Sequence, residues 1–145
     1  MTELQKDAHI KKNVLAEIVG LSLPSTNDRI LRLESHGYIT SYTTVLNHKK
    51  LKYDITCFIF VKSESSKHFS SIIQNALKEK EVLECHSVTG EGSHILKIRT
   101  QNTTTLEKLL ARIQAWPGVT ATTSSIVLST HKETTNIYLN NKNQS

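Results

Sequence analysis

The segment 13–37 contains two short stretches whose apolar positions recur at helical spacing. In the first stretch, NVLAEIVG (13–20), four apolar residues share one helical face: Val14, Leu15, Ile18 and Val19. We expect Asn13 to cap the start of this helix, because its side chain accepts hydrogen bonds from free N–H groups. Gly20 is placed to end the helix, because glycine readily adopts the left-handed conformation found there.

The second stretch, SLPSTNDRILRLESHG (22–37), follows after a turn at Leu21. Ser22 is the expected N-cap, Pro24 is tolerated in the first turn, and Gly37 ends the helix. The residues expected to face inward are spaced by four and three positions: Thr26, Ile30 and Leu33. Two short helices joined by a tight turn predict a helix-turn-helix.

The pattern changes at Tyr38. The run YITSYTTVL (38–46) is rich in β-branched and aromatic residues, and the polar NHKK (47–50) interrupts it. Such a composition is typical of extended backbone. We therefore expect an extended β-linker after the helix-turn-helix.

From Ile55 onward, strand-like and helix-like stretches alternate. Their order is strand 55–63, helix 69–80, strand 82–88, strand 94–100, helix 103–116 and strand 119–129. A threonine at the start of the second helix is its expected cap, and Trp-Pro-Gly ends it. The order βαββαβ predicts a ferredoxin-like antiparallel sheet with strand order 4-1-3-2 and both helices on one face.

The sequence thus predicts an α+β fold. Its expected parts are a winged-type helix-turn-helix domain at 1–40, a β-linker at 41–54, a ferredoxin-like domain at 55–135 and a tail at 136–145. The tail is rich in asparagine and is expected to fray after Leu139. The sheet face away from the helices lacks a covering element, so we expect a second copy of the chain to cover it in a homodimer.

Four stretches resemble motifs of the leucine-responsive/asparagine-responsive regulator (Lrp/AsnC) family. They are NVLAEIVGLS, RILRLESHGYI, VLECHSVTGEGSHILKI and WPGVTATTSSIVLSTHKETT, and the resemblance covers roughly residues 8 to 139. It implies a transcription regulator that binds double-stranded DNA and dimerises through its ferredoxin-like domains. It also implies further association into tetramers or octamers, and an amino acid or similar small effector bound between dimers.

Members of this family begin with a full first helix. Here the segment MTELQKDAH carries Leu4 as its single large apolar residue, so we expect an apparently truncated first helix. A shortened helix would leave apolar side chains of the helix-turn-helix partly exposed, at about 25 cal/mol per Å². The side chains in question are Val14, Leu15, Ile18 and Ile30.

The second helix of the pair is the expected DNA-reading element, because arginine and asparagine pair with guanine and adenine in the major groove. The expected groove contacts are Ser25, Asn27, Arg29 and Arg32. We expect the helix start at Ser22 to face a phosphate, and Lys11 and Lys12 to bind backbone phosphates. Alternatively, the two arginines pair with Asp28 and Glu34 on a solvated helix that contacts no DNA.

The turn TGEGSH (89–94) is the expected effector loop, because its glycines allow successive N–H groups to point at a carboxylate. The candidate contacts are Gly90, Glu91, Gly92, Ser93 and His94, with the hydroxyls of Thr122 and Ser124 on the last strand. In the family, the corresponding loop and strand hold the amino-acid effector. The alternative is a plain hairpin turn that binds no ligand.

Charge and composition agree with a nucleic-acid partner without requiring one. The 145 residues carry a net charge of +5, which suits a polyanion. No run of 18 apolar residues is present and the start lacks a secretory signal, so we expect a cytoplasmic protein without a membrane partner.

No enzyme motif, cofactor or metal is predicted. Cys57 and Cys85 are expected on non-adjacent strands, so a metal site that they share with His86 or His94 is not favoured. Siroheme decarboxylases resemble the same fold combination, and they remain the enzyme alternative, with Arg99 and His94 as its candidate side chains. A second alternative is an effector-binding paralogue with weak or lost DNA binding that modulates assembly through mixed oligomers.

Overall fold

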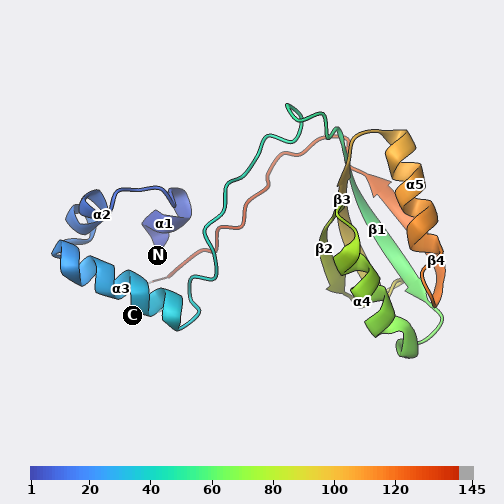
Figure 1. Cartoon of the computed structure of the whole chain (residues 1–145), viewed down its shortest axis with the longest axis horizontal. Helices are drawn as coiled ribbons and strands as arrows, with labels where there is room; N and C mark the ends of the chain where they lie inside the picture. Colours follow the sequence, from blue (N-terminus) through green and yellow to red (C-terminus); the bar gives the residue numbers. More distant parts are fainter. Residues whose placement is uncertain (141–145) are drawn as a thin grey trace. The chain divides into compact units, whose positions relative to one another are not determined.

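The computed structural model describes residues 1–140, and the chain forms two compact units (Figure 1). The first unit, here called the head, comprises Met1–Leu46 and the chain from Lys132 onward. The second unit, here called the body, comprises Asn47–His131. Residues 141–145 of the predicted tail lie outside the described residues.

Three helices form the head: α1 (Thr2–Lys6), α2 (Lys12–Val19) and α3 (Leu23–Ser35). Gly20 has φ of 68° and ends α2 as predicted. Ser22 caps α3, and its side chain accepts a hydrogen bond from the Ser25 N–H. The prediction for the start of α2 was wrong, because the N-cap is Lys11, which places Asn13 inside the first turn.

The interior of the head is small. Leu15 of α2 and Ile30 of α3 are buried, together with Ala16 and Thr26. The expected exposure of Leu15 and Ile30 was therefore wrong, although Ile18 is 55% exposed as expected. Val14 is also exposed. The head thus depends on a few buried contacts along one side of each helix.

The linker between the two units forms no strand within one chain. Residues 39–47 belong to no helix or strand and are mostly exposed, and a turn follows at 48–52. In that turn His48 Nδ1 lies 2.7 Å from the Tyr53 carbonyl oxygen. Extended backbone becomes a strand only when a neighbouring segment pairs with it, and the composition of 38–46 could not predict whether such a partner is present.

The body has the predicted βαββαβ order, with one added 3-10 turn. Its elements are β1 (Ile55–Ser63), η1 (Ser66–His68), α4 (Phe69–Lys78), β2 (Val82–Ser87), β3 (His94–Thr100), α5 (Thr103–Gln114) and β4 (Val119–Ile126). The sheet order is β2-β3-β1-β4 with antiparallel pairs, which confirms the predicted order in reverse notation. The N-cap of α5 is Asn102, not a threonine, and its side chain forms a capping box with Thr105.

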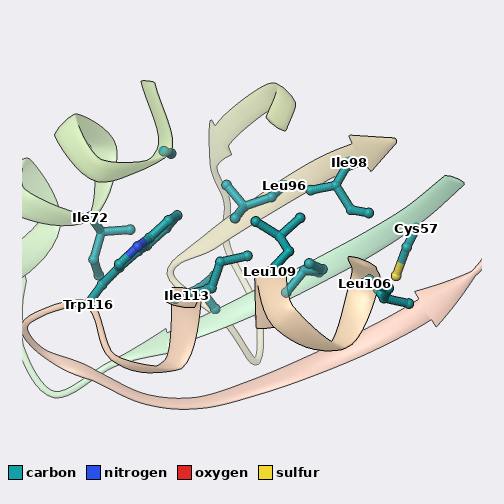
Figure 2. Packing of buried hydrophobic residues seen from close by; sticks show 11 residues of the cluster. Cys57, Ile72, Leu96, Ile98, Leu106, Leu109, Ile113 and Trp116 are labelled. Atoms are coloured by element: carbon teal, nitrogen blue, oxygen red, sulfur yellow. The ribbon is translucent and has the colours of Figure 1, made fainter. Parts of the chain in front are cut away.

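The hydrophobic core lies between both helices and one face of the sheet. Figure 2 shows Leu106, Leu109 and Ile113 of α5 packed over the strands. Strand residues of alternating position complete the core: Cys57, Ile59, Val61, Leu96 and Ile98. Trp116, which follows α5, closes one end next to Ile72 of α4. This alternation fixes which side chains face the opposite, open side of the sheet.

The open face carries aromatic and aliphatic residues. Phe58 pairs with Lys97 and Ser125, and Phe60 pairs with Ile95 and Thr123. Residues paired in this way point to the same side of the sheet, and these alternate with the core residues. Phe60 is 37% exposed. The predicted uncovered apolar face is therefore present in the single chain.

Candidate nucleic-acid interface and effector site

The outward side of α3 presents polar and charged side chains. Ser25, Asp28, Arg29 and Arg32 are all exposed. Arg32 Nη2 lies 3.0 Å from Asp28 Oδ2, so the anticipated ion pair between these two residues exists. Glu34 instead accepts a hydrogen bond of 2.8 Å from the Tyr42 hydroxyl, and within residues 1–140 it pairs with no arginine.

The basic residues of the head differ in whether their side chains are held by an ion pair. Arg29 has no ion pair or side-chain hydrogen bond among residues 1–140. Lys11 and Lys12 are exposed where α2 begins. Long cationic side chains without a fixed partner are suited to phosphate oxygens, because these contacts demand charge more than geometry.

The start of α3 offers fewer free donors than the sequence predicted. The Ser25 N–H donates to Ser22 Oγ at 3.3 Å, and the Thr26 N–H donates to the Ser22 carbonyl. Pro24 has no N–H at all. The helix start at Ser22 is thus partly capped by its own chain, and within the described residues the N–H groups of Ser22 and Leu23 remain for an anion.

Asn27 does not share the outward face with the arginines. Its Oδ1 is buried and has no hydrogen-bond partner within the described part of the chain. The side chain lines a cavity of about 500 Å³ between α1 and α3. Other residues of this cavity are Leu4, Ile10, Leu15, Ile30 and Tyr42. We therefore leave Asn27 out of the groove contacts proposed below.

The effector loop between β2 and β3 is tied to the end of β1. The Ser93 N–H and Ser93 Oγ both donate to the Val61 carbonyl, at 2.9 Å and 3.2 Å. The Val88 N–H donates to the Ser93 carbonyl at 3.0 Å. Gly90 has φ of 105°, which favours glycine. A Cβ on Gly92 would lie 3.1 Å from the Val61 oxygen, so a side chain there would require the strand end to shift by a few tenths of an ångström.

A hollow of about 480 Å³ lies beside this loop. Four predicted residues line it: Gly90, Glu91, Gly92 and Ser93. Further lining residues come from elsewhere: Lys62, Ser63, Ser65, Ser66, Phe69, Val88, Thr89 and Thr120. Lys62 and the serines were missed by sequence reasoning. The run KSESS (62–66) at the end of a predicted strand was the available signal, because it places an ammonium group beside three hydroxyl groups.

His94 lies beneath the loop and does not face solvent. It is fully buried, and Phe69 packs edge-to-face against its ring at 5.0 Å between centroids. Nδ1 lies 2.8 Å from Ser93 Oγ, whereas Nε2 is buried without a partner among the described residues. Burial lowers the pKa of His94 below its usual value. His94 therefore supports the loop from inside as a neutral side chain.

Thr122 and Ser124 lie on the helix-covered side of β4, away from the loop of the same chain. They pair with Val61 and Ile59, whose side chains face the core. Thr122 Oγ1 accepts a hydrogen bond of 2.9 Å from Gln114 Nε2. Within one chain, Thr120 is the β4 residue that reaches the hollow, because β4 shifts register near Lys62.

The two cysteines are separated by β3. Cys57 on β1 is buried and Cys85 on β2 is partly buried, and burial raises the pKa of both thiols. Among residues 1–140, no three His, Cys, Asp or Glu side chains gather as metal ligands. In the same range, no helix has the length and apolar character needed to cross a membrane.

Comparison with known proteins identifies both units. Residues 56–137 match the Lrp/AsnC ligand binding domain, and residues 1–40 match a winged helix-turn-helix DNA-binding domain. The chain belongs to the Lrp/AsnC family. This confirms the predicted family and the winged type of the DNA-binding domain.

Individual relatives agree with this assignment to the Lrp/AsnC family. The HTH-type transcriptional regulator FL11 of Pyrococcus abyssi is 35% identical over 134 residues, covering 92% of this chain and 88% of the relative. The leucine-responsive regulatory protein of Klebsiella pneumoniae is 32% identical, covering 96% and 87%. A solved transcriptional regulator from Neisseria meningitidis in complex with L-Met has a TM-score of 0.90 at 27% identity, covering 94% and 90%.

This Lrp/AsnC protein is a transcriptional regulator that binds DNA through its helix-turn-helix. These relatives confirm the predicted DNA-binding transcription regulator. They are transcription regulators and not enzymes, which decides against the siroheme decarboxylase alternative.

Proposed function

We propose that this Lrp/AsnC regulator binds its operator as a homodimer and responds to an amino acid or a similar small effector held at the 88–93 loop. The outward face of α3 carries the proposal. It places Ser25, Arg29 and Arg32 on the exposed side of the second helix of a helix-turn-helix. In this motif, that helix enters the major groove.

In the proposed complex, base contacts and phosphate contacts come from different residues. Ser25 and Arg32 are proposed to face base edges. They are seven residues apart in α3 and therefore lie on the same side of the helix, in the middle of its exposed surface. Arg29, Lys11 and Lys12 bind phosphates, which position the head without reading sequence. The N–H groups of Ser22 and Leu23 at the start of α3 add at most two further donors.

The homodimer is proposed to form across the open face of the sheet. Phe58, Phe60 and Ile95 form an apolar strip there, and the ion pair of Lys97 with Glu84 at 3.1 Å borders it. A two-fold contact buries the same strip on both copies and also provides two heads for a palindromic operator. Tetramers or octamers of this dimer remain part of the proposal.

The effector is proposed to occupy the hollow beside the 88–93 loop. Lys62 offers an ammonium group to a carboxylate, and Glu91 offers a carboxylate to an ammonium group. Hydroxyls of Ser63 and Thr120 supply further donors and acceptors. The Neisseria regulator solved with L-Met supports an amino acid as the ligand class. Thr122 and Ser124 enter this proposal only through a second dimer, since they lie away from the loop of their own chain.

The test of DNA binding is fluorescence anisotropy with duplexes from the protein's own promoter at several salt concentrations. A regulator gives a linear fall of log K against log salt, with a slope of about −0.9 for each phosphate neutralised. Arg29→Ala should remove one phosphate contact and therefore make this negative slope less steep by about one. An affinity no higher for the promoter than for a random duplex would instead favour the assembly-modulating alternative.

The test of the effector is a thermal-shift screen of the common amino acids, repeated with Lys62→Ala. A shift with one amino acid that Lys62→Ala abolishes supports the site. Flat responses to all of them would favour a plain hairpin turn. Lys108→Ala, on the exposed side of α5 and away from the loop, is the matched control.

A further inference from the structure

The outward face of α3 contains a carboxylate where DNA phosphates approach. Asp28 Oδ2 lies 3.0 Å from Arg32 Nη2, one helical turn along the same face. The side chains are 61% and 71% exposed, so both are available to a partner. A carboxylate at this position opposes phosphate binding, because its negative charge repels the negative charge of the phosphates. The position of Asp28 therefore calls for a role in recognition.

Stability of the helix does not explain the pair. An exposed i,i+4 pair contributes only about 0.3–0.5 kcal/mol, and acid-before-base order gives no more than that. Ser22 and the buried Thr26 and Ile30 already hold α3 in place. The relevant effect of the ion pair is instead on the orientation of the Arg32 guanidinium group.

Arginine has five N–H donors in a planar fork, and one contact with a carboxylate leaves an edge free. A guanine in the major groove offers two acceptors, O6 and N7, that match such an edge. An arginine held by a carboxylate loses less side-chain entropy when it makes this paired contact. It also has less freedom to turn toward a phosphate.

We propose that Asp28 is a positioning residue that holds Arg32 for a guanine in the operator and weakens binding through phosphates alone. The inference rests on the groove contacts of α3 proposed above. Arg29 provides an internal contrast, because it lies next to Asp28 in the chain and has no ion pair among the described residues. Arg29 then supplies affinity for any sequence, whereas Arg32 supplies discrimination.

The experiment selects duplexes from a randomised pool with the full chain and then measures affinities by anisotropy. The variants are Asp28→Asn, Asp28→Glu, Arg32→Ala and the double variant Asp28→Asn/Arg32→Ala. Glu107→Gln is the matched control, because it removes one exposed acidic charge from α5 in the body. Circular dichroism verifies that each variant keeps its helices.

The wild-type chain should select one guanine in each half-site and lose about tenfold in affinity when that guanine is replaced. Asp28→Asn should reduce this loss to about threefold or less and should tighten binding to random duplexes. Asp28→Glu, which still reaches Arg32, should retain most of the preference. Glu107→Gln should behave as the wild-type chain does.

The double variant separates positioning from simple charge. If Asp28 acts through Arg32, then Asp28→Asn changes no base preference once Arg32 is alanine. An unchanged guanine preference in Asp28→Asn, or an equal loss of preference in both backgrounds, overturns the inference alone. Failure of the wild-type chain to bind any duplex overturns the proposed groove contacts and the inference with them.

Discussion

The side-chain amide of Gln5 is paired with the main chain of Ile137 by two hydrogen bonds. Gln5 Nε2 donates to the Ile137 carbonyl at 3.0 Å, and the Ile137 N–H donates to Gln5 Oε1 at 2.7 Å. An amide side chain thereby takes the place of a neighbouring strand. The short helix α1 thus fixes a segment that follows the whole body in the chain.

Gln5→Ala should release this segment. Each lost hydrogen bond contributes about 0.5–1.5 kcal/mol at most in an exposed setting. We expect the Ile137 amide to exchange its hydrogen up to about tenfold faster, measured by hydrogen exchange. Gln74→Ala, on the exposed side of α4, is the control and should leave Ile137 unchanged. Equal exchange in Gln5→Ala would show that the pairing does not hold the segment.

The open sheet face predicts a charge-sensitive dimer. Phe60→Asp places a carboxylate on the apolar strip, and burying it without a partner costs several kcal/mol. We expect dissociation to monomers in sedimentation or light scattering. Leu128→Asp is the matched control, because Leu128 is 96% exposed just after β4. A Phe60→Asp chain that stays fully dimeric would place the interface elsewhere.

His94 predicts a loss of stability in acid. Its folded pKa lies below the usual 6.5 because burial disfavours the charged ring. The unfolded chain therefore binds the proton more readily, so this contribution is complete above pH 6.5 and is lost as pH falls toward the folded pKa. Urea unfolding followed by Trp116 fluorescence should give a lower midpoint at about pH 5.5 than at about pH 7.5.

The variant His94→Asn isolates that effect. Asparagine keeps a polar atom near Ser93 Oγ but does not titrate, so its midpoint should change less between the two pH values. His131→Asn, at an exposed position, is the control, and its urea midpoint should differ between the two pH values as much as that of the wild-type chain. A pH dependence that is the same in His94→Asn would assign the acid sensitivity to other groups.

Leu109 and Leu77 give a direct comparison of buried and exposed leucines. Leu109 of α5 is fully buried, whereas Leu77 of α4 is 70% exposed. Leu109→Ala should lower the free energy of unfolding by about 2–5 kcal/mol, because it leaves a cavity in the core. Leu77→Ala should cost much less. Trp116, the single tryptophan, reports on this core in urea titrations.

Gly118 predicts a second sensitive position in the body. Its φ is 82°, and a Cβ there would lie 2.1 Å from His68 Cγ. Gly118→Ala therefore combines backbone strain of about 1 kcal/mol or more with a clash that moves His68. Gly90→Ala is the comparison, since Gly90 is also left-handed but has open space around it. Gly118→Ala should be the less stable of the two in urea unfolding.

The fold of the body was predictable because its signals are local and agree with one another. Alternating apolar residues marked β1, and the spacing of Leu106, Leu109 and Ile113 marked α5. Errors arose at boundaries, where neighbouring residues compete for one role. Asn102 rather than a threonine caps α5, because the asparagine oxygen reaches the Thr105 N–H at 3.0 Å.

The candidate sites were predictable only in part, because side-chain direction depends on the neighbours that a helix or strand meets. Asparagine is a residue type that pairs with adenine, but the Asn27 side chain lines the cavity beside α1. Thr122 and Ser124 were grouped with the effector loop by resemblance, whereas strand register places them opposite core residues. Lys62 and Thr120 reach the hollow through a register shift that no residue pattern announces.

The division of the chain has a practical consequence for engineering. Because the segment from Lys132 belongs to the same unit as residues 1–46, the body is in effect an insertion within the head. Shortening the protein after His131 would therefore remove a piece of the head, including residues 132–137 of the stretch that matches the ligand binding domain, and would leave all four strands of the body in place. A fusion partner attached after Ile137 would likewise adjoin the head, which contains the helix-turn-helix.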